Sequence, residues 1–449
     1  MGGETRTIAE LSRALKARDV TAEAILDGCL RRIAVRNSTL NAFITVFEAD
    51  AREQAREADR EITAGRFRGP LHGIPISIKD LFDIRGSATT AASRVRRNHV
   101  AHRDAASIER LRAAGAVFVG RTNLHEFALG TTNDESAFGP ARHPLDPSRS
   151  PGGSSGGSAV SVADGMCVAS LGTDTGGSIR IPAAACGLVG LKPTLGELST
   201  DGVVPLSTTL DHIGPICRSV EDAALLYGVL RGETTPAPCA PVDLRELSLG
   251  IPRPFFLDRL DPDVASAFDG LCRRLREAGV RLRDVTIPHA GDVASIYLHI
   301  VLPEAAAFHA DTLERQPGDY RPNVRLRLEM GRYVLAEDYA RAQRGRSAIT
   351  VETDAALEGC DGLCLPALAI PAPTIGRVTV RVGQVEEPVR SLMLRCTQIF
   401  NITGHPAITL PCGRTRDGLS VGTQLVGRRN HTAALLGVAR AVESCLAGC

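Results

Sequence analysis

Residues 172–180 read Gly-Thr-Asp-Thr-Gly-Gly-Ser-Ile-Arg, and this glycine-rich stretch lies between two apolar runs, 166–171 and 181–184. A lone cluster of glycine and serine is most often a flexible loop. Here the flanking runs place the cluster inside the predicted core, where glycine permits backbone conformations that other residues rarely adopt. One use of such a turn is to point successive N–H groups at a developing negative charge. Thr175, Gly176 and Gly177 are therefore a candidate oxyanion hole beside Ser178.

A serine hydroxyl is a weak nucleophile without a base, so the sequence must supply one. None of the eleven histidines lies in this stretch or in the second glycine-rich cluster, residues 151–158 (Pro-Gly-Gly-Ser-Ser-Gly-Gly-Ser). Lysine can act as the base if burial lowers the pKa of its amine. Lys79 is the best-placed candidate because it follows residues 74–78, a short β-branched run that is typical of a buried strand.

The rest of the chain alternates helical and extended patterns. Thr7 and Glu10 form a capping-box pattern ahead of a first amphipathic helix, and a second helix is expected from about Thr21. Helix, glycine and strand follow one another twice, and a final helix closes the sequence; the expected segments are 105–114 with 116–119, 264–275 with 280–287, and 432–446. This alternation predicts a largely parallel or mixed sheet covered by helices.

The order of these motifs resembles the amidase-signature family. The resemblance rests on Gly73–Asp80 and the two glycine-rich clusters, and it continues through residues 186–194, 211–215, 400–406 and 418–427. It covers most of the chain outside roughly 230–390. The fold that it implies is a single large α/β domain over 1–449, in which a mixed β-sheet is sandwiched between α-helices. Within that domain we expect a catalytic core at about 65–220 and a variable substrate-pocket region at about 230–400.

The resemblance also implies a Ser-Ser-Lys triad. Ser178 takes the place of the nucleophile, Ser154 that of a bridging serine on a cis peptide bond, and Lys79 that of the final base. Ser154 lies 24 residues before Ser178, as the family pattern requires. Ser155, Asp174 and Arg180 stand where the family has residues that hold the nucleophile loop in shape. An ordinary ion pair would also account for Asp174 and Arg180.

The implied activity is hydrolysis of a linear amide-type C–N bond in a small amide, anilide or carbamate, through an acyl-enzyme on Ser178 and without metal or organic cofactor. The glutaminase subunit of a tRNA-dependent amidotransferase and a catalytically silent assembly homologue are the alternatives within the family. Glu135 and His143 stand where the family often has asparagine, so the pattern leaves the substrate open. We expect residues 290–345 and 385–400 to wall the pocket, with apolar members such as Leu302, Phe308, Leu392 and Met393.

Two other kinds of site fit the glycine clusters less well. Residues 153–157 match the G-x-S-x-G elbow of α/β-hydrolases, with Ser155 as nucleophile, but that elbow follows a strand and Pro147 and Pro151 disfavour one here. A phosphate-binding P-loop requires a G-K-[ST] sequence, which neither cluster contains.

The composition is that of an ordinary globular protein, with 43% apolar and 23% charged residues. The 52 basic residues nearly balance the 51 acidic ones, which argues against a nucleic-acid partner. No signal peptide is evident and no apolar run approaches the length of a membrane span, so we expect a cytoplasmic monomer or homodimer with a small-molecule substrate. The twelve cysteines are scattered without a C-x-x-C pair, which predicts buried thiols and no metal site.

Overall fold

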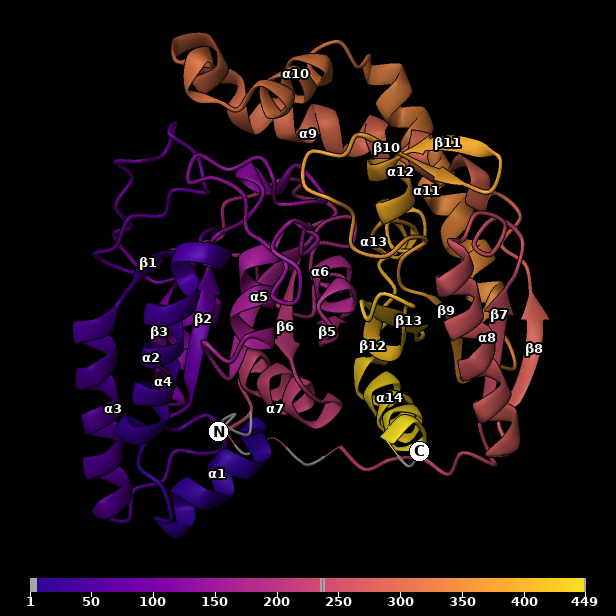
Figure 1. The fold of residues 1–449 in the computed structure, drawn as a ribbon. Coiled ribbons are helices and arrows are strands. Elements are labelled where there is room, and N and C mark those ends of the chain that lie inside the picture. Colours follow the sequence, from indigo (N-terminus) through magenta and orange to yellow (C-terminus); the bar gives the residue numbers. More distant parts are fainter. Residues whose placement is uncertain (1–5, 235, 237–238, 448–449) are drawn as a thin grey trace.

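The computed structural model describes residues 6–234, 236 and 239–447 and contains an 11-stranded sheet (Figure 1). The strands lie in the order β1-β3-β2-β4-β6-β5-β12-β13-β9-β7-β8. Their bounds are β1 (Phe43–Val46), β2 (Pro75–Lys79), β3 (Val117–Thr122), β4 (Ala169–Asp174), β5 (Val189–Lys192), β6 (His212–Cys217), β7 (Ser248–Pro252), β8 (Arg281–Val285), β9 (Gly362–Pro366), β12 (Ala407–Arg414) and β13 (Ser420–Val426). A separate hairpin pairs β10 (Thr379–Val382) with β11 (Val385–Pro388).

The sheet is mixed, as the sequence predicts. β2 runs parallel to β3 and β4, and β7 runs parallel to β8 and β9, whereas the other neighbouring pairs are antiparallel. β7, β8 and β9 come from the predicted variable region, yet they extend the sheet that holds the predicted catalytic core. One continuous sheet therefore supports both parts of the chain.

Helices cover both faces of the sheet. Their bounds are α1 (Ile8–Ala17), α2 (Ala22–Leu40), α3 (Glu48–Thr63), α4 (Ala106–Ala113), α5 (Gly156–Ala163), α6 (Arg180–Ala185), α7 (Val220–Arg231), α8 (Pro262–Glu277), α9 (Val293–Arg315), α10 (Pro322–Gly331), α11 (Ala336–Ala356), α12 (Val389–Leu394), α13 (Ile399–Ile402) and α14 (Thr432–Ala447). Every residue of β2 to β6 is buried, which is expected only when both faces are covered. The predicted sandwich of helices around a mixed sheet is confirmed.

The elements that the sequence predicts around the motifs are present. Thr7 and Glu10 form the capping box of α1. The apolar run before Lys79 forms β2, with Lys79 as its last residue. The two predicted pairs of helix and strand are α4 with β3 and α8 with β8, and the final helix is α14.

Residues between β8 and β9 form a layer of their own. Figure 1 shows α9, α10 and the β10–β11 hairpin at the end of the molecule opposite the two marked termini. α9 packs against α10 and α11, and its buried residues share a core cluster with Leu81, Leu124 and Phe400. This layer therefore lies on the main body of the protein and does not form an independent unit.

One helical stretch in the described chain, Ala290–Arg315, is long and apolar enough to cross a membrane by length and composition alone. The expectation that no apolar run approaches this length is therefore wrong. Within its apolar window 44% of the residues are buried, and the helix contains Pro303. Its contacts with α10 and α11 bury part of its surface.

Candidate active site

Lys79 is fully buried at the end of β2, where its amine meets two hydroxyl groups. Its Nζ donates to Ser154 Oγ at 2.9 Å and to Thr173 Oγ1 at 2.7 Å. Thr173 lies on β4, which pairs in parallel with β2, so neighbouring strands bring the two side chains together. The lysine predicted from its position at a strand end is therefore bonded directly to the predicted bridging serine.

Burial controls the charge of this amine. Removal from water lowers the pKa of Lys79 to about 7, while the negative charges of Asp174 and Asp211 oppose the shift. Near neutral pH a large fraction of the Lys79 side chains is neutral and carries a free lone pair. The amine can then accept a proton from Ser154.

The glycine-rich cluster of residues 151–158 holds Ser154 and Ser155 in a compact loop ahead of α5. The peptide bond between Gly153 and Ser154 is cis, as the resemblance implies. The carbonyl of Ser154 accepts from the backbone N–H of His125 at 3.1 Å, and the N–H of Ser155 donates to the carbonyl of Ser178 at 3.2 Å. The two glycine-rich clusters therefore lie against each other.

The glycine-rich cluster of residues 172–180 forms the loop between β4 and α6, and its carbonyl groups accept hydrogen bonds from residues outside the loop. Thr397 Oγ1 donates to the carbonyl of Gly176 at 2.7 Å, and the N–H of Ile181 donates to that of Gly177 at 2.6 Å. Among the described residues, no protein acceptor bonds the N–H groups of residues 175–178. These free donors suit the predicted oxyanion hole.

Gly177 cannot be replaced without disturbing this loop. Its φ is +137°, a conformation that L side chains rarely adopt. A Cβ atom added there would lie 2.3 Å from Thr397 Oγ1 and 2.8 Å from Ile181 Cδ1. At Gly176 an added Cβ would lie 2.7 Å from the hydroxyl of Tyr297. Neighbouring side chains therefore lie too close to the backbone at both positions for any residue larger than glycine.

Asp174 and Arg180 fix the two ends of the loop and are both fully buried. Arg180 Nη2 donates to Asp174 Oδ1 at 2.9 Å, and Asp174 Oδ2 accepts from the backbone N–H of Ile179 at 3.1 Å. Burial opposes ionisation of Asp174, but the charge and hydrogen bonds of Arg180 outweigh it and hold the pKa of Asp174 below its usual range. Asn401 and Gln424 also accept from Arg180, at 2.6 Å each. The pair is thus the centre of a buried network and more than an isolated ion pair.

A small cavity with an empty volume of ≈ 220 Å³ opens beside Ser178. Its lining comes from three parts of the chain: Ala128, Leu129, Gly130 and Thr131; Gly176, Ser178 and Leu206; and Tyr297, Arg390 and Leu394. The predicted regions 290–345 and 385–400 do contribute to the wall. The particular residues proposed there are wrong, because Leu302, Phe308, Leu392 and Met393 do not line the cavity; Leu392 and Met393 pack in a separate core cluster.

The two clusters contain four serines, and of these Ser178 is the one that lines this cavity. Ser154 and Ser155 are fully buried, and Ser155 Oγ donates to the carbonyl of Thr173 at 3.2 Å. Residues 150–155 form no strand ahead of α5. The structure therefore lacks the strand that a G-x-S-x-G elbow at Ser155 requires.

His143 and Glu135, which depart from the family pattern, lie in different parts of the structure. His143 is buried, and its Nε2 lies 3.0 Å from the carbonyl of Ala185 at the end of α6. The side chain of Glu135 accepts from Asn323 Nδ2 of α10. Neither residue lines the cavity beside Ser178.

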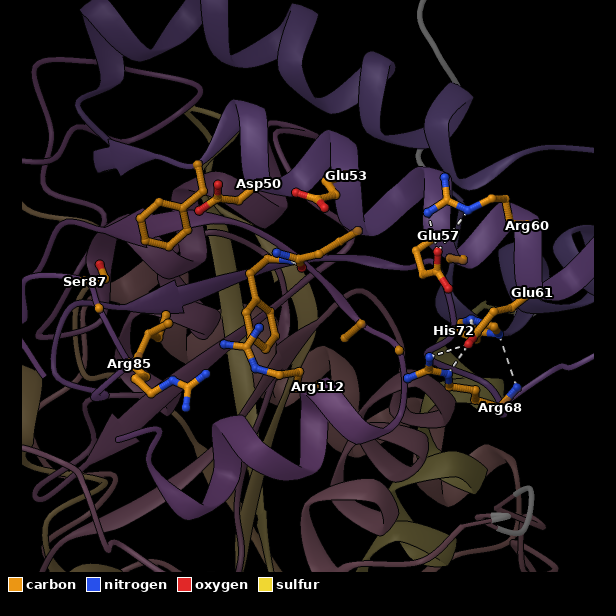
Figure 2. A pocket seen from close by; sticks show the side chains of 18 residues that line it. Asp50, Glu53, Glu57, Arg60, Glu61, Arg68, His72, Arg85, Ser87 and Arg112 are labelled. Carbon is orange, nitrogen blue, oxygen red and sulfur yellow. Dashed lines mark hydrogen bonds and ion pairs between the residues drawn. The ribbon is translucent and has the colours of Figure 1, made fainter. Parts of the chain in front are cut away.

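A larger, more open hollow lies elsewhere on the molecule (Figure 2). Its charged side chains pair with one another: Glu61 binds Arg68 and His72, and Glu57 binds Arg60. None of Lys79, Ser154 and Ser178 lines it. Within the described residues, no group of three or more His, Cys, Asp or Glu side chains is placed to hold a metal ion.

A buried lysine bonded to a serine, beside a glycine-rich loop that presents a second serine to a cavity, has the layout of a serine-type hydrolase site. The chain matches the Amidase family model over residues 24–436. It is 41% identical to an amidase of Pseudomonas putida over 428 residues, which cover 92% of this chain and 90% of that protein. It belongs to the amidase family, whose members hydrolyse amide C–N bonds.

Two further similarities extend along the whole chain. A glutamyl-tRNA(Gln) amidotransferase subunit of Roseiflexus sp. (strain RS-1) is 37% identical, with 97% of this chain and 96% of that protein covered. A solved amidase structure superimposes with a TM-score of 0.93 at 37% identity and covers 98% of this chain and all of its own. The family and fold are thus shown, whereas the relatives differ in what they act on.

Five residues of this site were not predicted from the sequence to have a role in it. Thr173 and Asn401 lie in the motifs that carry the resemblance, and their bonds to Lys79 and Asp174 could have been suspected from that position. Asp211 also lies in one of these motifs, and its Oδ1 accepts a hydrogen bond from Thr175 Oγ1 at 2.6 Å. Tyr297 and Arg390 lie in the variable region, where the sequence offers no signal for either.

Proposed function

We propose that this protein hydrolyses a small amide through an acyl-enzyme on Ser178, with Ser154 and Lys79 as a proton relay. The observation that carries the proposal is the buried hydrogen bond between Lys79 Nζ and Ser154 Oγ, beside a cavity that Ser178 lines. A lysine whose pKa lies near 7 can take up and release a proton at neutral pH, as an acid–base catalyst must.

The reaction begins when Ser178 Oγ attacks the carbonyl carbon of the substrate. As the new C–O bond forms, the proton of Ser178 passes to Ser154, and the proton of Ser154 passes to the neutral amine of Lys79. The carbonyl electron pair moves to oxygen, and the N–H groups of Thr175, Gly176 and Gly177 stabilise the resulting oxyanion. Collapse of this intermediate breaks the C–N bond.

The relay then runs in reverse. Lys79 returns its proton through Ser154 to the leaving nitrogen, which departs as a neutral amine or ammonia. Water attacks the acyl-enzyme, the relay removes its proton in the same way, and the acid product leaves Ser178 with its hydroxyl restored. No metal or organic cofactor is required for these steps.

The substrate that we propose is a small amide, anilide or carbamate. The cavity beside Ser178 has room for about one water molecule in this conformation, which favours a short molecule. We further propose that the protein acts as a monomer or homodimer in the cytoplasm, with this small molecule as its partner.

Fluorophosphonate labelling followed by peptide mass spectrometry tests the proposed chemistry. We expect a single label on Ser178, which is lost in Lys79→Ala and retained in Ser155→Ala. Label on Ser155, or no label on a folded protein, would contradict the assignment. The latter result would favour the catalytically silent homologue.

A glutaminase subunit is the second candidate, because the amidotransferase protein of Roseiflexus sp. (strain RS-1) is 37% identical over 97% of this chain. In that case glutamine is the substrate and ammonia passes to a partner protein. Hydrolysis of glutamine in preference to simple amides, aryl amides and aryl carbamates would support this candidate. Preference for a compound other than glutamine would support the small-molecule amidase.

A further inference from the structure

Arg390 presents a positive charge to the cavity beside Ser178 without a partner. It lies in the first turn of α12 and lines the cavity together with Gly176 and Ser178. Within residues 6–234, 236 and 239–447 its guanidinium makes no hydrogen bond or ion pair. The Arg390 side chain is half-buried, and its guanidinium has five N–H donors that can bind an anionic ligand in the cavity.

The surroundings of Arg390 add positive charge and do not cancel it. Burial and then repulsion by Arg327 lower the pKa of Arg390 to about 10. The guanidinium of Arg327 is itself engaged, since its Nη1 donates to the carbonyl of Leu129 at 2.8 Å. His125 lies behind Gly130, and burial lowers its pKa to about 3, so it is neutral near pH 7.

Among the residues that the structure describes, no carboxylate lines the cavity. Asp211 is close to the loop, but its oxygens accept from Thr175 Oγ1 at 2.6 Å and from the N–H groups of Leu206 and Ser207 at 2.9 and 3.1 Å. Asp134 interacts with His125 at 3.7 Å and does not line the cavity. The counter-ion for Arg390 is therefore not supplied by the nearby acidic side chains.

Tyr297 places a second donor in the same cavity. Its ring is buried, its hydroxyl lies against Gly176, and within the described chain that hydroxyl has no hydrogen-bond partner. Tyr297 and Arg390 line the same small cavity. A planar guanidinium and a hydroxyl together suit the two oxygens of one carboxylate.

We propose that Arg390 and Tyr297 form a carboxylate subsite, so that the substrate is a short amide that carries its own carboxylate near the scissile bond. This proposal rests on the proposed function and gives its substrate class. The lining of the cavity contains no acidic side chain to receive an ammonium group, so the subsite distinguishes such a substrate from glutamine, which carries both charges.

Matched pairs of amides test the subsite. Succinamate is compared with neutral butyramide, which places the carboxylate in the acyl part, and N-acetylglycine with N-propylacetamide, which places it in the amine part. We expect wild type to prefer the carboxylate member of at least one pair by about ten- to hundred-fold in kcat/KM, as a charge-assisted hydrogen bond provides. Arg390→Gln removes that preference, and Arg390→Lys retains part of it.

Controls separate this proposal from the proposed chemistry. Arg381→Gln, at an exposed position of the β10–β11 hairpin, keeps the wild-type preference. Fluorophosphonate labelling of Ser178 in Arg390→Gln shows that the catalytic groups remain intact. Two results would overturn the subsite even if Ser178 is still labelled. In the first, the wild-type enzyme prefers neither succinamate nor N-acetylglycine over its neutral counterpart. In the second, the preference persists in Arg390→Gln.

Binding of succinate gives a readout that needs no turnover. In Ser178→Ala, we expect succinate to raise the melting temperature, and in the double variant with Arg390→Gln we expect no such rise. If Ser178 is not labelled but succinate still binds through Arg390, the proposed chemistry fails and the subsite stands. If succinate stabilises neither variant, the subsite is overturned whatever the labelling shows.

Discussion

Lys79 is the residue whose charge state governs the proposed reaction. Burial lowers the pKa of its amine to about 7, and only the neutral amine can accept the proton of Ser154. The rate of fluorophosphonate labelling of Ser178 should therefore fall about tenfold per pH unit as the pH drops below about 7. A labelling rate that stays flat from pH 8 to pH 5 in a folded protein would contradict a neutral lysine base.

Ser154 and Ser155 are neighbours with different roles, and this difference is testable. Ser154→Ala breaks the relay and should lower kcat by about 10²- to 10⁴-fold, the usual contribution of a proton-transfer group. Ser155→Ala removes a hydrogen bond to the carbonyl of Thr173, which is worth about 1 kcal/mol, and should cost less than about tenfold. Equal losses in the two variants would show that Ser154 acts only through the shape of the loop.

The sequence pointed to individual site residues where they lie in a recognisable motif. Lys79, Ser154 and Ser178 follow from ordered sequence patterns, and the structure brings Lys79 and Ser154 into contact and places Ser178 on the cavity. Thr173 was not assigned a role, because its bond to Lys79 depends on the parallel register of β2 and β4. A hydrogen bond across two strands has no signature in either strand alone.

At the scale of elements, the loop between β4 and α6 depends on a backbone conformation that glycine supplies. Gly177→Ala forces a Cβ atom to within 2.3 Å of Thr397 Oγ1 at a φ of +137°. We expect kcat to fall at least about 10²-fold, as loss of one oxyanion-hole donor does, with little change in far-UV circular dichroism. Gly376→Ala is the matched control, because Gly376 also has positive φ but has no atom within 4 Å of the added Cβ. Comparable losses of activity in both variants would argue against a specific role for the loop.

The buried pair of Asp174 and Arg180 should be required for stability. Asp174→Asn leaves the Arg180 charge uncompensated inside the protein and should lower the free energy of unfolding by about 3–5 kcal/mol, measured by urea denaturation. Asp311→Asn, which breaks an exposed pair with Arg315, should leave it nearly unchanged. If the two variants were equally stable, the network around Asp174 would not be important for folding.

Several elements outside the layer between β8 and β9 were predicted from the sequence, whereas the elements of that layer were not. α4, β3, α8 and β8 follow from apolar periodicity and from glycines at the ends of helices. The stretch Ala290–Arg315 is apolar around much of its surface, so its sequence resembles a membrane span as much as a core helix. In the structure, contacts with α10 and α11 bury part of the surface of this stretch.

For the whole molecule, the fold was accessible from sequence but the pocket was not. Alternating helices and strands predict a mixed sheet, and the motifs narrow this to one family. The cavity, by contrast, is lined by Ser178 together with Tyr297 of α9 and Arg390 of α12, which are more than a hundred residues away in the sequence. Contacts between such distant segments leave no local pattern.

The purified chain should be active by itself. The groups of the proposed relay, the glycine loop and the cavity all come from this one chain, so hydrolysis should not require tRNA or a second protein. Turnover of the amide panel by the isolated protein checks this expectation. Activity that appears only when amidotransferase partners are added would support the glutaminase reading instead.

The central claim is that Ser178 carries the acyl group during turnover. Acid quenching of the enzyme within its first turnovers of a reactive amide, followed by peptide mass spectrometry, measures this directly. We expect an adduct with the mass of the substrate's acyl group on the peptide that contains Ser178, and none in Ser178→Ala. An acyl adduct on Ser155, or undiminished turnover by Ser178→Ala, would contradict it.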